Sequence, residues 1–309
     1  MNLETFEVRP DDENERIDKY ITVLYPEKSR SFFQKLIKSG KIKVNDTAVK
    51  ANYIVKTDDI IEIEFPDNEE ANIKPENIPL EILYEDDDVL VVNKPKGMVV
   101  HPSIGHYSGT LVNAIMYHCK DSLSGINGEI RPGIVHRIDM NTTGSLIVCK
   151  NDFAHINIAQ QIKVHSVNRI YEGIVCGNLK EETGTIHAPI GRNPKDRMKM
   201  AINEKNGKDA ITHYELIRNY KNYAYVRFKL ETGRTHQIRV HMASIGHPLL
   251  GDDIYGSGHG YGNQFKHLEG QTLHAKTIGF VHPVTGEYIE ISAPLPDYFK
   301  EILKKLESM

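Results

Sequence analysis

The chain is poor in several features that would define a class of protein. It has only three cysteines, Cys119, Cys149 and Cys176, which lie far apart and form no Cys-x-x-Cys pair. Neither a disulfide framework nor structural zinc is expected, and the thiols should be buried and reduced. No stretch approaches the roughly 18 apolar residues that span a bilayer, and the N-terminus has neither a basic start nor an apolar run. We therefore expect a cytoplasmic protein without a membrane partner.

A phosphate-binding loop of the form GxxxxGK[ST] is also missing, which excludes the nucleotidases that depend on it. Histidine is plentiful, but His236 and His241 lie five positions apart, off the i, i+4 spacing of two-histidine zinc motifs on helices. We expect neither a metal nor another cofactor. With 309 residues and 39% hydrophobic content, the chain can form one large domain or two unequal ones.

The chain has no net positive charge, since its formal charge is −4, and this sum does not indicate a nucleic-acid binder. The distribution of charge is more informative. The window 28–56 contains eight basic side chains and one acid, whereas the rest of the chain is acidic. Such a run can be a solvated face, but Arg30, Lys35 and Lys38 share one predicted helix and are candidate RNA contacts.

Residues 1–66 are predicted to form a small domain of two helices packed on a small sheet. The predicted elements are amphipathic helices at 16–25, with Ile17, Tyr20, Ile21 and Leu24 on one face, and at 30–38, and alternating strands at 41–44 and 60–65. This order resembles the small RNA-binding domain shared by a ribosomal small-subunit protein and several tRNA and rRNA enzymes. The resemblance covers about residues 14–66.

The remaining chain divides into a linker and a larger domain. Residues 67–79 are acidic and rich in proline and asparagine, so they are predicted to be the linker. Residues 80–309 show short apolar strands and helical patches without regular alternation, which favours an α+β domain with a mixed or antiparallel sheet. The elements predicted there are strands near 89–92, 146–149, 170–175, 224–230 and 289–292 and helices near 110–119 and 154–164.

Two polar segments of the larger domain have the composition of a site. The sequence His136-Arg-Ile-Asp139 places a basic pair and one carboxylate before a glycine turn, and Thr232-Gly-Arg-Thr-His-Gln-Ile-Arg239 offers a dense set of hydrogen-bond donors on a strand or short helix. Sites are often built on loops of this type, although Asp139 alone could be a capping or surface acid. Together the two segments suggest a polyanion site with a paired carboxylate.

Four ordered motifs are similar to those of the RluA-like family of RNA pseudouridine synthases. They are Asn93-Lys-Pro-x-Gly, the His-Arg-Ile-Asp loop ending in Thr-Gly, Tyr171-Glu-Gly-Ile-Val-Cys-Gly177, and Thr-Gly-Arg-Thr-His-Gln-Ile-Arg. With Gly246-His-Pro-Leu-Leu-Gly-Asp252, the likeness spans about residues 80–295, and the domain in front makes the large-subunit ribosomal RNA subgroup the most similar. The resemblance implies an enzyme that isomerises uridine to pseudouridine in structured RNA, by base flipping and rearrangement of the glycosidic bond.

The resemblance also implies roles for individual residues. Asp139 corresponds to the catalytic aspartate, Tyr171 to the tyrosine that stacks on the base, and Arg239 to the arginine that pairs with the aspartate. The further candidate contacts to the substrate are Arg137, which matches an arginine that occupies the space left by the flipped nucleotide, Ile238, which matches an apolar residue packed at the site, His136 and Arg234.

The sequence departs from the family pattern at three places. Thr143 stands where the family usually has serine, and Ser145 stands where it has an apolar residue. The segment before Tyr171 reads Asn-Arg-Ile instead of a lysine-containing run. Each departure could change loop packing or RNA contacts without removing a catalytic group.

Other functions fit parts of the sequence. A transfer RNA target would use the same motifs, and an RNA-binding protein without catalysis would need only the small domain. A glycoside hydrolase or nucleosidase usually needs two carboxylates, and Asp252 and Asp253 are interpreted as turn residues, so Asp139 stands alone. The partner is expected to be RNA, and the protein is expected to be a monomer. The residues leave open whether Asp139 attacks the ribose, adds to the uracil or removes a ribose proton.

Overall fold

The computed structural model describes residues 2–25, 30–65, 73–103, 105–120, 122–126, 132–194, 196, 199–256, 265 and 267–309. The chain divides into two compact units, residues 1–72 and 73–309. Residues 67–72 of the predicted linker lie outside the described residues. Ile73 is buried, and the carbonyl of Lys74 accepts a hydrogen bond from the side chain of Asn113 at 2.8 Å. The second unit therefore begins before residue 80.

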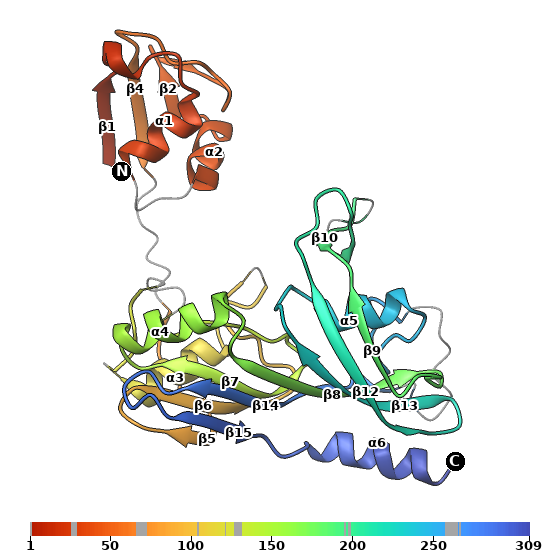
Figure 1. The fold of residues 1–309 in the computed structure, drawn as a ribbon. Helices are drawn as coiled ribbons and strands as arrows, with labels where there is room; N and C mark the ends of the chain where they lie inside the picture. The colour runs from red at the N-terminus through yellow and green to blue at the C-terminus, as the bar shows by residue number, and fades with distance from the viewer. Residues whose placement is uncertain are drawn as a thin grey trace. The chain divides into compact units, whose positions relative to one another are not determined.

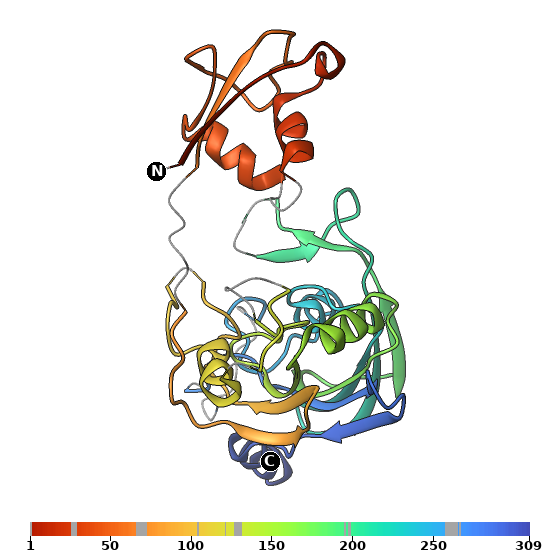
Figure 2. The same cartoon turned by 90° about the vertical axis from the view of Figure 1, so that its left-hand side faces the viewer.

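The first unit has two helices packed on a small sheet (Figures 1 and 2). Its strands run in the order β1-β4-β2-β3, and neighbours are antiparallel. The elements are β1 (Asn2–Glu7), a 3-10 helix (Pro10–Asp12), α1 (Ile17–Leu24), α2 (Arg30–Lys38), β2 (Ile42–Val44), β3 (Thr47–Ala48) and β4 (Ile60–Phe65). Ile17, Phe33 and Ile61 are fully buried in its core, which confirms the predicted arrangement.

Helix α2 carries the three basic residues predicted to contact RNA. Lys35 and Lys38 are exposed, whereas Arg30 forms an ion pair with the buried carboxylate of Asp18 at 2.8 Å. Burial opposes ionisation of Asp18, but hydrogen bonds from Gln34 and two arginines outweigh burial and lower its pKa to about 2. Arg30 is also exposed, but it has a structural ion pair within the unit, whereas no ion pair of Lys35 or Lys38 is found among the described residues.

The second unit is built on a nine-stranded mixed sheet in the order β5-β6-β7-β14-β8-β13-β12-β9, with β15 beside β14. Strands β7 and β14 are parallel, and the other neighbours are antiparallel. The strands are β5 (Glu81–Glu85), β6 (Val89–Lys94), β7 (Thr143–Cys149), β8 (Asn168–Cys176), β9 (Thr183–His187), β12 (Ile211–Asn219), β13 (Tyr223–Leu230), β14 (Leu273–Val281) and β15 (Tyr288–Ser292). This architecture confirms the predicted α+β class.

Helices cover both sides of this sheet. They are α3 (Leu111–Cys119), α4 (Asp152–Lys163), α5 (Gln237–Ser244) and α6 (Asp297–Glu307), and a separate hairpin is formed by β10 (Ile190–Arg192) and β11 (Met200–Ile202). Figures 1 and 2 place α4 and α5 on one side and α6 on the other. On β8, Val175 joins the cluster that contains Met242 of α5, and Ile174 joins the cluster that contains Phe299 of α6. Alternate side chains of β8 therefore face different layers.

The sheet register brings the predicted site residues toward one another. In the middle of the sheet, Tyr171 of β8 is opposite Ala275 of β14, and Ala275 is opposite Gly144 of β7. Asp139 lies on the loop that enters β7. Because neighbouring strands are about 4.8 Å apart, that loop reaches the sheet about 10 Å from Tyr171.

Two further expectations concern the cysteines and membrane-spanning helices. Cys119, Cys149 and Cys176 are buried free thiols, as predicted. Within the described residues, no helix is both long enough and apolar enough to cross a membrane.

Candidate active site

Two cavities share Asp139 in their walls. Their volumes are about 420 Å³ and about 340 Å³, and the residues common to both are Arg137, Ile138, Asp139, His236 and Arg239. The larger cavity is also lined by His136, Tyr171, Arg234 and Ile238. It therefore brings together all the site residues predicted for the second unit, and its size is typical of ligand sites. Among the described residues that line it, Asp139 is the only carboxylate.

Asp139 is paired with Arg239. Its Oδ2 accepts a hydrogen bond from Nη1 of Arg239 at 3.0 Å, and the arginine side chain is only 4% exposed. Burial alone would lower the pKa of Arg239, but hydrogen bonds and charge from Asp252 and Asp139 raise it, so the guanidinium remains a cation. A fixed positive charge therefore lies in hydrogen-bond contact with Asp139.

Asp252 holds the other edge of the Arg239 guanidinium. Its fully buried carboxylate accepts from Nε at 2.7 Å and from Nη2 at 3.0 Å, which is a bidentate pair. Its Oδ1 also accepts from the backbone N–H groups of Ile254 and Tyr255. The interpretation of Asp252 as a turn residue is thus incomplete. The residue caps its turn and also directs Nη1 of Arg239 toward Asp139, a contact that chain spacing does not reveal.

His236 is oriented toward Asp139 by Tyr255. The Tyr255 hydroxyl oxygen accepts the N–H of Met200 at 3.0 Å, which leaves its O–H to donate to Nδ1 of His236 at 2.8 Å. We therefore assign the imidazole hydrogen to Nε2, which faces Oδ1 of Asp139 at 3.9 Å. Burial lowers the pKa of His236 despite the nearby charge of Asp139. Tyr255 had no predicted role, because it meets the site only in the folded chain.

The segment from Thr232 to Arg239 is a loop followed by a short helix, one of the two predicted possibilities. It turns at His236, whose φ of 57° is in the left-handed region, and α5 begins at Gln237. The buried Oε1 of Gln237 accepts from the Thr232 hydroxyl at 2.8 Å and from the backbone N–H of Arg234 at 2.9 Å. Its Nε2 donates to the backbone of β12. One side chain thus fastens the donor-rich loop to the sheet.

Lys94 of the Asn-Lys-Pro motif ties two site loops together. Its fully buried ammonium donates to the carbonyls of Pro95, Met98 and Met140 at 2.8, 2.8 and 2.9 Å. Met140 directly follows Asp139, so these bonds hold the backbone beside that carboxylate. Burial lowers the pKa of Lys94 to about 7, an effect that the charge of Asp139 partly offsets.

Tyr171 and Ile238 supply apolar surface to the larger cavity. Both are buried and belong to the same hydrophobic cluster. Burial raises the pKa of Tyr171, so its phenol keeps its proton at neutral pH. An aromatic ring beside a carboxylate offers a surface on which a planar base can stack.

Arg137 and Arg234 lie at the edge of the same cavity. Arg137 is exposed and donates from Nη2 to the hydroxyl of Thr235 at 3.0 Å. Arg234 is half-buried and donates from Nε to a backbone carbonyl at 2.8 Å. Both guanidinium groups retain further N–H donors for a ligand.

The partly buried His136 and the fully buried His274 predict that the second unit is destabilised by acid. Nε2 of His136 accepts the N–H of Ile147 at 3.0 Å, and burial, followed by the charge of Arg169, lowers its pKa to about 3. Burial likewise lowers the pKa of His274 to about 4. Because both residues fold in the neutral form, the unfolded chain binds more protons below the ordinary pKa of 6.5, and stability falls as pH drops from about 6.5 toward 4. We expect a loss of roughly 1 kcal/mol per histidine by pH 5.5.

Urea unfolding followed by circular dichroism at neutral and acidic pH measures this loss. His136→Gln keeps an acceptor for the Ile147 N–H but removes the titrating group, so its stability should vary less with pH. Replacement of the exposed His267 by Gln is the matched control and should leave the pH dependence nearly unchanged. Equal pH dependence in all three proteins would contradict the prediction.

The Thr143-Gly144 motif allows β7 and β14 to approach closely. Gly144 has a φ of 108°, and a Cβ atom there would lie 2.2 Å from the carbonyl oxygen of Ala275. The residues on either side of Gly144 form hydrogen bonds from β7 to β14. Thr143 Oγ1 lies 2.8 Å from Nδ1 of His274, and Ser145 donates to the Ala275 carbonyl at 3.0 Å. Two departures from the family pattern are therefore used in strand packing.

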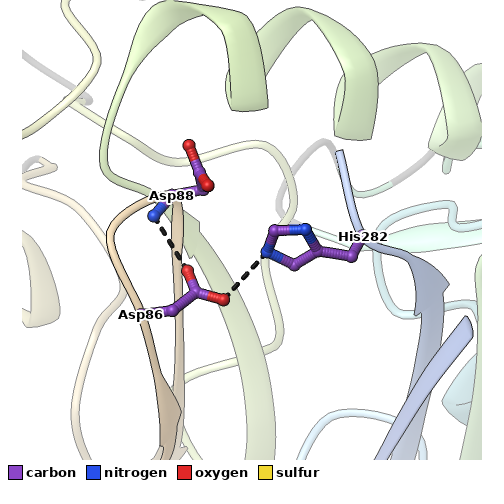
Figure 3. A group of neighbouring side chains, drawn as sticks. All are labelled: Asp86, Asp88 and His282. Carbon is purple, nitrogen blue, oxygen red and sulfur yellow. Dashed lines mark hydrogen bonds and ion pairs between the residues drawn. The ribbon is translucent and has the colours of Figure 1, made fainter. Parts of the chain in front are cut away.

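A separate group of acidic and histidine side chains lies at the turn between β5 and β6 (Figure 3). Nδ1 of His282 accepts the N–H of Thr285 at 3.1 Å, so its Nε2 carries the hydrogen that it donates to Asp86 at 2.8 Å. Asp86 also accepts the N–H of Asp88, and Asp88 accepts from the side chain of Asn151. These bonds join three turns, and we assign the group a structural role.

Sequence comparison links both units to known families. The RNA pseudouridylate synthase family matches residues 88–244, and the S4 domain matches residues 15–61. The "Uncharacterized RNA pseudouridine synthase YlyB" of Bacillus subtilis (strain 168) is 47% identical over 306 residues, which cover 99% of each chain. The "Ribosomal large subunit pseudouridine synthase D" of Zymomonas mobilis is 44% identical over 297 residues, which cover 94% of this chain and 93% of that protein.

A solved structure agrees with these relatives. The human "RNA Pseudouridylate Synthase Domain Containing 1" superposes with a TM-score of 0.57 at 25% identity and covers 75% of this chain and 96% of its own. The matched segment 88–244 includes Asp139, Tyr171 and Arg239. The chain is an RNA pseudouridine synthase with an N-terminal S4 domain, and it belongs to the RNA pseudouridylate synthase family.

Proposed function

We propose that this enzyme modifies uridine in large-subunit ribosomal RNA and that Asp139 is its essential carboxylate. The observation that carries the proposal is the Asp139–Arg239 pair in the wall of a cavity whose apolar surface is supplied by Tyr171. Relatives named ribosomal large subunit pseudouridine synthase D support the choice of RNA. The S4 domain supports it as well.

The target base must leave the RNA stack before it can react. Extrusion of a nucleotide costs a few kcal/mol, and stacking on an aromatic ring returns about 1–3 kcal/mol per base. Tyr171 would supply that ring, and the exposed Arg137 would fill the space that the base leaves. The uracil would then lie between Tyr171 and Asp139.

Pseudouridine formation exchanges the N1–C1′ bond of uridine for a C5–C1′ bond. Attack on C1′, addition to the uracil ring and removal of a ribose proton are three possible first steps, and each requires an ionised carboxylate. Arg239 places a fixed positive charge beside Asp139. Because Asp252 already holds the guanidinium, little reorganisation is needed when charge changes at Asp139.

A two-carboxylate hydrolysis of the glycosidic bond is less compatible with this geometry. Asp252 is fully buried and lies on the opposite edge of the Arg239 guanidinium from Asp139. It is not among the described residues that line the larger cavity. Among the described residues that line the larger cavity, Asp139 therefore has no second carboxylate opposite it, as a glycoside hydrolase requires.

Mapping of carbodiimide-resistant uridines in RNA from cells with and without the gene tests the choice of substrate. We expect one or more sites to disappear from large-subunit ribosomal RNA. The wild-type gene should restore them, and the Asp139→Asn gene should not. Loss of sites only in transfer RNA would replace the ribosomal target, and unchanged maps in every RNA would refute the proposal.

We predict that the S4 domain contributes affinity and not chemistry. Deletion of residues 1–72 leaves a unit with its own hydrophobic core, which should fold and modify a short RNA at nearly the full rate. Affinity for long structured RNA should fall. The dependence of log affinity on log salt should become shallower, because basic residues that displace counterions are lost.

A pair of substitutions in the full chain tests the same point more finely. Lys35→Gln combined with Lys38→Gln should reduce the salt slope by about one to two, measured by RNA binding over a range of salt concentrations. Lys304 and Lys305 form an exposed pair on α6, and their replacement by Gln is the matched control. If the two double variants had equal slopes of log affinity against log salt, the lysines of α2 would be solvated charges that do not contact RNA.

A further inference from the structure

Arg169 is a buried cation that has no ionic partner in the described part of the chain. It lies on β8 two residues before Tyr171 and is 7% exposed. Its Nη2 donates to the carbonyl of Glu231 at 2.9 Å, and its Nε has no hydrogen-bond partner. No described carboxylate lies within ion-pair distance of it. Buried charges in proteins are normally paired, so this one requires an explanation.

The Arg169 side chain faces the larger cavity. Residues i and i+2 of a strand point to the same face, and Arg169 and Tyr171 both line that cavity. Gly233 leaves room for the guanidinium, since a Cβ atom there would lie 2.5 Å from Nη1 of Arg169. Burial lowers the pKa of Arg169, but an arginine stays protonated at neutral pH.

The cavity has an excess of positive charge. Arg137, Lys163, Arg169 and Arg234 line it, while its carboxylate, Asp139, is already paired with Arg239. A cationic cavity with an unpaired, preoriented guanidinium fits an anion. In an RNA substrate, the anion closest to any base is a backbone phosphate.

We propose that Arg169 binds the phosphate next to the flipped uridine, with Arg234 beside it. The proposal rests on the proposed position of the target base between Tyr171 and Asp139. Folding already desolvates and orients the guanidinium of Arg169. RNA binding therefore does not include the free-energy cost of desolvating this cation. The guanidinium can donate two parallel hydrogen bonds to one phosphate.

RNA binding to the Asp139→Asn protein tests the proposal without turnover. The probe is a short RNA that contains the mapped uridine and carries a neutral methylphosphonate in place of one phosphate at a time. At one linkage beside the uridine, the substitution should weaken binding about 10- to 100-fold, as expected for loss of a charge-assisted hydrogen bond. In the Asp139→Asn/Arg169→Met protein, a methylphosphonate at the same linkage should not weaken RNA binding further.

Two other variants make the result specific to Arg169. Lys163 is an exposed cation of the same cavity, and Lys163→Gln should leave the linkage effect intact. Arg169→Lys keeps the positive charge but loses the two parallel N–H donors of the guanidinium, so the methylphosphonate should weaken its RNA binding less than in the parent protein. If the Arg169→Met protein does not fold, Arg169→Lys takes its place in the test. A linkage effect that persists undiminished in the Arg169 variants would overturn the proposal.

Failure of the proposal is distinguishable from failure of the proposed function. If the mapped uridine lies in transfer RNA, the probe is taken from that RNA and the binding test is unchanged. The absence of any linkage effect beside the uridine, in a protein whose Asp139→Asn variant is inactive, would overturn the phosphate contact alone. An active Asp139→Asn protein would instead contradict the assigned position of the base.

Discussion

Asp139→Asn is expected to abolish pseudouridine formation while RNA affinity stays within a few-fold of wild type. Asparagine has nearly the same shape, and its carbonyl oxygen can still accept a hydrogen bond from Arg239. It cannot act as a nucleophile or a base, and loss of such a group costs on the order of 10⁴-fold or more in turnover. Release of tritium from C5 of labelled uridine under single-turnover conditions measures the rate.

The neighbouring acid Asp253 provides a matched control. It is exposed and lines only the smaller of the two cavities. Asp253→Asn should retain activity within a few-fold, because it removes the same charge near the same site without touching the Arg239 pair. Near-normal activity of Asp139→Asn would remove Asp139 from the mechanism.

Arg239→Met is expected to lower turnover by about 10²- to 10³-fold, in the range seen when a preorganised charge is removed from an active site. It should also destabilise the second unit by about 3–5 kcal/mol, because the fully buried Asp252 loses its cation. RNA affinity should change much less than turnover.

A double variant separates the catalytic loss from the loss of stability. Arg239→Met/Asp252→Asn removes both buried charges, and the asparagine oxygen can still accept from the backbone N–H groups of Ile254 and Tyr255. Stability should recover in large part while turnover stays low. If activity returned together with stability, Arg239 would be only a structural residue.

Several elements of this protein could be predicted from short stretches of sequence. The apolar spacing of residues 30–38 predicted α2 with its observed bounds, and alternation at residues 60–65 predicted β4. Both signals are local, because helix and strand periodicities of 3.6 and 2 residues are complete within a few turns or pleats. The motifs were also local, so their order along the chain was enough to predict the family. Local spacing was less informative at the ends of elements. It placed Leu24 on the apolar face of the first helix, but Leu24 is the last residue of α1 and is 45% exposed.

The contacts that shape the site were decided by tertiary structure. Asp139 and Arg239 are 100 positions apart, and they meet because parallel pairing of β7 with β14 carries the Asp139 loop to the centre of the sheet. Of the partners that orient them, Asp252 was interpreted as a turn residue, Tyr255 had no predicted role, and Lys94 belonged to a motif without a predicted contact. Their roles depend on burial and on hydrogen bonds between distant segments, and periodicity carries no information about which distant segments pair. Residue types and their order were therefore sufficient for the reaction class, whereas the pairing of Asp252 with Arg239 and of Arg239 with Asp139 exists only because folding brings three distant segments together and buries Arg239 and Asp252.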